Sequence, residues 1–76
     1  HYPVKNGLYV YFRLYESDVV MVIMNNNKSS KMIDLKQFEE LLSNKDNAIN
    51  IFNDRTYKIS KPMRVPGKTT MVLDIE

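Results

Sequence analysis

The sequence predicts an all-β fold, an antiparallel β-sandwich of about eight short strands (Greek-key type) with one short helix. Three observations lead to this fold class. Residues 8–15 alternate aliphatic or Phe side chains with Tyr and Arg, the period of a strand with one face on the core. Turn-forming residues recur about every eight to twelve positions, as between short antiparallel strands. Only one segment, after Asp34, has helical periodicity.

The first predicted element is a hairpin, with strands at residues 8–15 and 19–24 and a polar turn at 16–18. In the first strand we expect Phe12 and its aliphatic neighbours on the core face. The second strand is a nearly continuous apolar run, typical of a central strand that is covered on both faces. The other face of the first strand carries Tyr9, Tyr11, Arg13 and Tyr15.

A polar loop at residues 25–31 precedes a possible short strand at 32–33 and then the helix. Asp34 with Gln37 three positions later is typical of a capping box. The helix is expected to be about two turns long and to end near residues 43–44. Its apolar face consists of Leu35, Phe38, Leu41 and Leu42.

Three further strands are predicted in the second half, at residues 48–52, 56–59 and 69–75, and Pro62 restricts the chain before residues 63–65. Ile49 and Ile51 share one face of the first of these. The turn residues between them are 53–55 and the dipeptide Pro66–Gly67. In the last strand, alternation predicts one core face, made of Met71, Leu73 and Ile75.

Length and composition bound the class of protein. With 76 residues, 43% of them hydrophobic, the chain allows one domain, residues 1–76, with a thin core. It contains no apolar run of about 18 residues, so no membrane span is predicted. It starts with His1 rather than Met, which favours a piece of a longer protein.

Catalytic chemistry is poorly represented. There is no Cys, and His1 is the only His. The sequence therefore lacks the residues for a Cys–His or Ser–His nucleophile–base pair and for a metal site with two His ligands. Glu39 and Glu40 are neighbours on the predicted helix and diverge by about 100°, so they cannot face each other as a glycosidase pair does. We therefore predict no catalytic residue, no metal and no cofactor.

The row Tyr9, Tyr11 and Tyr15, with Arg13 beside it, is the one feature that points to binding. Alternate residues of a strand lie about 6.7 Å apart, so the row could stack on sugar rings or nucleobases. Tyr is also common where one protein surface covers another, and we favour this interface hypothesis. Nucleic-acid binding is not expected, because the eleven Lys and Arg are scattered and the net charge is only +2.

The run 3–25 resembles the C-terminal domain of cyclomaltodextrinases and neopullulanases in the α-amylase family of glycoside hydrolases. The most specific part is Gly7-Leu8-Tyr9-Val10-Tyr11-Phe12-Arg13, followed by the Val-rich strand that ends in Asn25. The Asp34-Leu35 pair before a short helix and the tail at 65–73 are also similar. The segment 43–62 matches the family only in its general type of residues and contains no specific motif.

The resemblance implies a non-catalytic accessory domain that packs on and stabilises the catalytic (β/α)8 barrel of the same polypeptide. The parent would hydrolyse α-1,4-glucans by a retaining mechanism, with its catalytic acids in the barrel and none in this chain. The alternative is an autonomous α-glucan-binding module that uses the Tyr row. The sequence does not determine the cellular location of the parent enzyme, and an exported or periplasmic bacterial enzyme is favoured.

Overall fold

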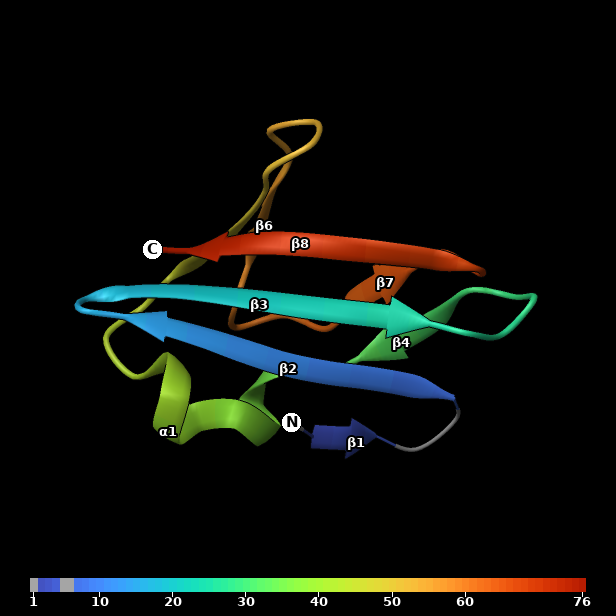
Figure 1. Ribbon diagram of the computed structural model, residues 1–76, viewed down its shortest axis with the longest axis horizontal. Coiled ribbons are helices and arrows are strands. Elements are labelled where there is room, and N and C mark those ends of the chain that lie inside the picture. The colour runs from blue at the N-terminus through green and yellow to red at the C-terminus, as the bar shows by residue number, and fades with distance from the viewer. Residues whose placement is uncertain (1, 5–6) are drawn as a thin grey trace.

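One antiparallel sheet forms the main layer of the domain. The computed structural model describes the backbone of residues 2–4 and the whole of residues 7–76, so His1 lies outside the described residues. The strands of this sheet are β1 (Tyr2–Val4), β2 (Leu8–Tyr15), β3 (Asp18–Asn25), β5 (Asn47–Asn50), β6 (Thr56–Lys58) and β8 (Thr69–Ile75). Within the described chain their order is β1-β2-β3-β8-β5-β6, and all neighbours are antiparallel (Figure 1).

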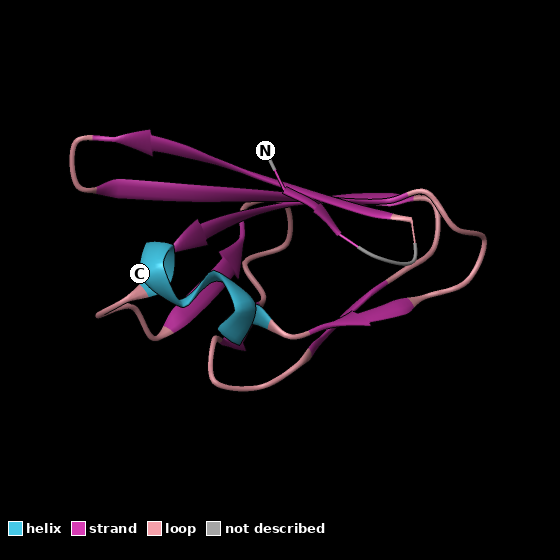
Figure 2. Ribbon diagram, turned by 90° about the horizontal axis from the view of Figure 1, so that it is seen from below, coloured by secondary structure: helices cyan, strands magenta, loops and turns pink. Residues whose placement is uncertain are grey.

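The second layer is smaller and lies on one side of the main sheet. It contains the antiparallel pair β4 (Lys31–Ile33) and β7 (Met63–Val65), and a helical segment made of a 3₁₀ turn η1 (Leu35–Phe38) that continues into α1 (Glu39–Leu42). Figure 2 shows the main sheet nearly edge-on, with the helical segment and the small sheet on the same side of it. The predicted antiparallel sandwich with one short helix is confirmed.

The core fills the space between the two layers. Inward side chains alternate along each long strand, because successive residues of a strand point to opposite faces. The largest fully buried side chains come from both layers: Leu8, Val10, Met21, Ile23, Leu35, Val65, Leu73 and Ile75. The core face predicted for residues 69–75 is confirmed, since Met71, Leu73 and Ile75 are all buried.

The helical segment begins where the sequence predicted. The Asp34 carboxylate accepts a hydrogen bond from the Lys36 backbone N–H at 3.0 Å, as an N-cap residue does. The Gln37 side-chain amide donates to the Asp34 carbonyl at 2.9 Å, whereas a capping box would have it reach the N–H of the cap residue. Leu35, Phe38 and Leu42 are buried against the main sheet.

Two details of the second half differ from the prediction. The strand expected at 48–52 ends at Asn50, because the Asn50 side-chain oxygen accepts from the Phe52 N–H at 2.8 Å and the chain turns there. Ile49 and Ile51 do not share a strand face, because Ile49 is half-buried on the face of β5 opposite the buried Ala48 and Asn50, and Ile51 is exposed in the turn.

The first strand keeps its predicted faces, with less burial at the hairpin end. Phe12 points to the core side but is only half-buried, and its ring meets the edge of Phe38 with centroids 5.4 Å apart. Leu14 is 60% exposed, since it lies next to the hairpin turn. The core therefore ends near Phe12.

One buried amide ties the loop after β3 to the turn between β7 and β8. Asn25 is 3% exposed, and its amide N–H groups donate to the carbonyls of Ser29, Val65 and Pro66 at 3.0–3.1 Å. Its side-chain oxygen accepts from the backbone N–H and the side-chain amide of Asn27, each at 2.9 Å. This buried side chain is costly to remove, because its buried bond to the Val65 carbonyl and its part-buried bonds to Ser29, Pro66 and Asn27 are lost together.

Gly67 stands at the same junction because no side chain fits there. A Cβ at this position would lie 2.2 Å from the Lys28 carbonyl oxygen, which is far inside contact distance. The two segments are joined directly by the Lys68 N–H, which donates to the Asn27 carbonyl at 2.8 Å. The sequence predicted a turn at Pro66–Gly67, and the structure adds the reason for the glycine.

We predict that Asn25→Ala lowers the free energy of unfolding by about 1–3 kcal/mol, since the buried Val65 carbonyl loses this donor and the two Asn27 N–H groups lose this acceptor. Asn26→Ala is the matched control, because Asn26 is exposed and such a change costs at most about 0.5 kcal/mol. Urea titrations followed by circular dichroism would measure both. Equal midpoints for the two variants would contradict the role given to Asn25.

Candidate functional site

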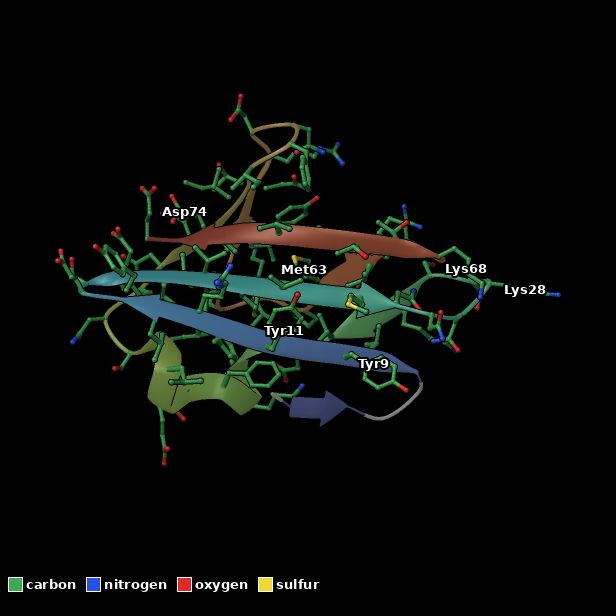
Figure 3. All side chains as sticks on the ribbon, viewed as in Figure 1. Tyr9, Tyr11, Lys28, Met63, Lys68 and Asp74 are labelled. Atoms are coloured by element: carbon green, nitrogen blue, oxygen red, sulfur yellow. The ribbon has the colours of Figure 1, made fainter. Side chains whose placement is uncertain are left out.

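The predicted row of residues lies on the face of the main sheet that points away from the core. We call this the outer face: the outward side chains of β2, β3, β8 and β5. Tyr9 is 40% exposed, Tyr11 is half-buried, Arg13 is exposed and Tyr15 is 73% exposed near the hairpin turn. Figure 3 shows Tyr9 and Tyr11 standing along β2. The structure thus places the four candidates in one row, as the strand period requires.

The register of the sheet extends this row into an apolar surface. Tyr9 pairs with Met24, and Tyr11 pairs with Val22. On the other side of β3, Val22 pairs with Val72. Directly opposed residues of antiparallel strands are in side-chain contact, so the aromatic row continues into aliphatic side chains. The apolar members of the outer face are Tyr9, Tyr11, Val20, Val22, Met24, Ile49 and Val72.

No element of the described chain covers this face. Figure 2 shows the second layer on the opposite side of the sheet only. Val22 is 7% exposed, so its neighbours on the sheet already shield it, but Met24 is 39% exposed and Val20 is half-buried. The apolar run of β3 predicted cover on both faces; the described residues provide it on one. The described residues therefore leave the outer side of β3 without a second layer.

Charged residues gather at one end of the outer face. Val20 pairs with Asp74, and Arg13 is its partner on the other side. The pKa of Glu76 is raised, first by its side-chain hydrogen bond with Asp74 and then by repulsion from the Asp74 charge. Asp18 adds to this repulsion, and Lys45 opposes it. This end of the face is therefore negative overall.

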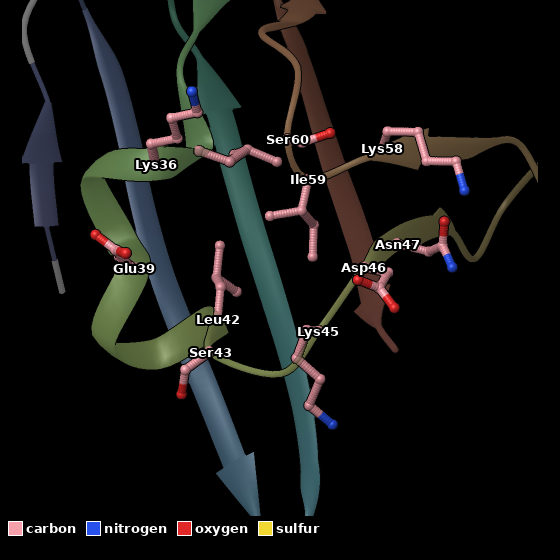
Figure 4. A pocket seen from close by; sticks show the side chains of 11 residues that line it. Lys36, Glu39, Leu42, Ser43, Lys45, Asp46, Asn47, Lys58, Ile59 and Ser60 are labelled. Atoms are coloured by element: carbon pink, nitrogen blue, oxygen red, sulfur yellow. The ribbon is translucent and has the colours of Figure 1, made fainter.

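A groove lies on the side of the molecule that carries the helical segment. It has a volume of about 610 Å³ and lies between the helical segment and the segments 45–47 and 58–60. Its floor includes the buried Leu35, Leu42 and Ile59. Figure 4 shows the side chains of Lys36, Lys45 and Lys58 pointing in different directions. The groove therefore lacks a point at which its cations converge on one ligand.

The acidic residues do not form a catalytic arrangement in the described part of the chain. Glu39 and Glu40 are exposed on α1. Among the described residues, no three or more His, Cys, Asp or Glu side chains form a group that could hold a metal. In the same residues, no helix is long and apolar enough to cross a membrane.

Comparison with known families decides what kind of domain this is. A family model described as the cyclo-malto-dextrinase C-terminal domain matches residues 1–74. The chain belongs to this family. The resemblance inferred from the first hairpin is thereby confirmed. A cyclo-malto-dextrinase C-terminal domain is one part of a multidomain enzyme, which suggests an accessory role.

Sequence reasoning did not identify all of the outer face of this cyclo-malto-dextrinase C-terminal domain. It found the row on β2 but not its neighbours Met24, Val72 and Ile49, since residues far apart in the chain meet only through the register of the strands. The signal that could have found them is the apolar run at 19–24, which contains too many outward apolar residues for a solvated face.

We predict that Asp74→Asn lowers the pKa of Glu76 toward its ordinary value, because it removes the negative charge beside it. Since the pKa is raised in the folded state, the folded state binds this proton more tightly than the unfolded chain. Its contribution to stability is present at pH below the ordinary glutamate range and is lost as the pH rises through the raised pKa. The chemical shift of the Glu76 carboxyl carbon, followed by NMR against pH, measures the change. Asp54→Asn, in an exposed turn, should leave that titration unchanged, and a Glu76 pKa unmoved by Asp74→Asn would refute the assignment.

Proposed function

We propose that this chain is a non-catalytic accessory domain that packs on the catalytic (β/α)8 barrel of a cyclomaltodextrinase- or neopullulanase-like glycoside hydrolase and stabilises it. The observation that carries the proposal is the uncovered outer face, whose central strand β3 is apolar on both sides. The family supplies the partner, because a C-terminal domain of such an enzyme shares its polypeptide with the catalytic domain. In this proposal the barrel of the parent enzyme, and not this domain, hydrolyses α-1,4-glucans.

The energetics favour a docked domain. A domain of this size gains only about 3–5 kcal/mol from its own core. Each 100 Å² of apolar surface that is covered adds about 2.5 kcal/mol before the costs of association. Met24 and Tyr9 are large, apolar and about 40% exposed, so covering them yields a gain that is comparable with the stability of the domain itself.

The proposal is tested by placing a charge on the outer face of the full parent chain. Met24→Glu should lower the melting temperature of the catalytic domain or split its transition in two, because a carboxylate cannot be buried unpaired at the contact. In a cooperative unit of about 150–250 residues, each kcal/mol of docking energy lost lowers the melting temperature by about 2–4 °C, and in a larger unit by less. Differential scanning calorimetry measures both effects.

Met32→Glu is the matched control. Met32 is 60% exposed on β4, in the other layer of the domain, so the same substitution there should leave the calorimetric trace unchanged. If Met24→Glu also leaves it unchanged, the domain does not stabilise the barrel through the outer face.

Binding of an α-glucan to the Tyr row is the second candidate, favoured by the exposure of Tyr9 and Tyr15. It predicts saturable binding of maltoheptaose that Tyr9→Ala abolishes, since aromatic rings stack on sugar faces. Phe52→Ala is the control, because Phe52 is 74% exposed but lies in the turn after β5. An NMR titration with no response up to millimolar sugar would exclude this second candidate.

A further inference from the structure

The shape of the apolar surface on the outer face is informative about what covers it. Its centre is a line of three side chains along β3, Val20, Val22 and Met24, which spans about 13 Å at two residues per step. Tyr11 and Val72 flank the middle of this line in register. At the middle of this line the apolar surface is three strands, or about 10 Å, wide. Ile49 on β5 lies beyond Asp74, at the Val20 end.

These dimensions fit one α-helix. A helix with its side chains is about 10–12 Å in diameter and rises about 5.4 Å per turn, so two to three turns lie over the line of β3. A second sheet would cover a wider area and would bury Asp74 and Thr70 on β8, which are polar and on the same face. An amphipathic helix leaves such flanking residues at its edges, where they stay in water.

The charged residues of the outer face indicate which end of a covering helix would carry basic side chains. At the Val20 end, three carboxylates lie near one another, those of Asp18, Asp74 and Glu76. Arg13, which pairs with Val20 from β2, and Lys45 offset two of these charges, so the excess at this end is one negative charge. At the Met24 end, the residues in register are the uncharged Tyr9 and Thr70. The mutual repulsion of the carboxylates is relieved by cations placed beside them, and an interface requires opposite charges to meet.

We infer that the outer face binds a single amphipathic α-helix of the catalytic domain, laid along β3, with its apolar stripe on Val20, Val22 and Met24 and its basic side chains over the end that holds Asp18, Asp74 and Glu76. This inference rests on the proposed function and names the element that makes the contact. It requires Lys or Arg on that helix at one end of the apolar stripe.

Photo-crosslinking in the full parent chain tests the inference. Photo-methionine is incorporated at every methionine with little change of shape; in the described residues Met24 and Met32 are exposed, whereas Met21, Met63 and Met71 are buried. Val20→Met adds a second reporter on the line of β3. Positions 20 and 24 lie about 13 Å apart, which corresponds to about nine residues of helix at 1.5 Å each. We expect both to capture residues of one helix, about nine positions apart, with Lys or Arg within a turn of the residue captured from position 20. Position 32 is the internal control and should not capture that helix.

The possible results separate this inference from the proposed function. Capture of a loop, a strand or a second copy of the chain from positions 20 and 24 would overturn the inference. If calorimetry of Met24→Glu still showed a lowered melting temperature, the proposed function would stand. Capture of the catalytic domain from position 32 alone would also overturn the inference. Absence of any capture between the domains, together with an unchanged melting temperature, would overturn both.

Discussion

The pairing of β3 with β2 on one side and with β8 on the other determines both faces of this domain. Each pairing runs along most of the strand, and side chains alternate strictly between the faces. The same register therefore places Met21 and Ile23 in the core and Val20, Val22 and Met24 on the outer face. A shift by one residue would exchange the two sets. The core and the candidate interface are thus fixed together.

The local signals in the sequence were sufficient for most of the fold. The hairpin, the capped helix and the last strand were predicted because period-two alternation, a cap residue and turn residues act over a few positions. Asn50 shows the limit of this reasoning. Its side chain ends β5 with a short-range hydrogen bond, in a segment whose isoleucines favoured a longer strand. The end of β5 depends on this one polar contact, which outweighs β-propensity.

Only the part of the candidate site on β2 could be predicted from the sequence. The row from Tyr9 to Tyr15 belongs to one strand and can be read from its spacing. Met24, Val72 and Ile49 join it through pairings between distant segments, which no local pattern encodes. The junction at Asn25 is similar, because three of its partners are backbone carbonyls, and carbonyls exist at every residue. Such contacts follow from the fold and cannot be read from residue types.

Protection of one methionine would test the central claim most directly. In the described domain, Met24 and Met32 are 39% and 60% exposed, and exposed methionines are oxidised to the sulfoxide. Treating the full parent chain with hydrogen peroxide and following both residues by mass spectrometry compares the two faces in one molecule. If the outer face is covered by the catalytic domain, Met24 should be oxidised at least about tenfold more slowly than Met32, as its accessible surface is removed. Oxidation of Met24 as fast as Met32 would show that the outer face is open to solvent and would contradict this account.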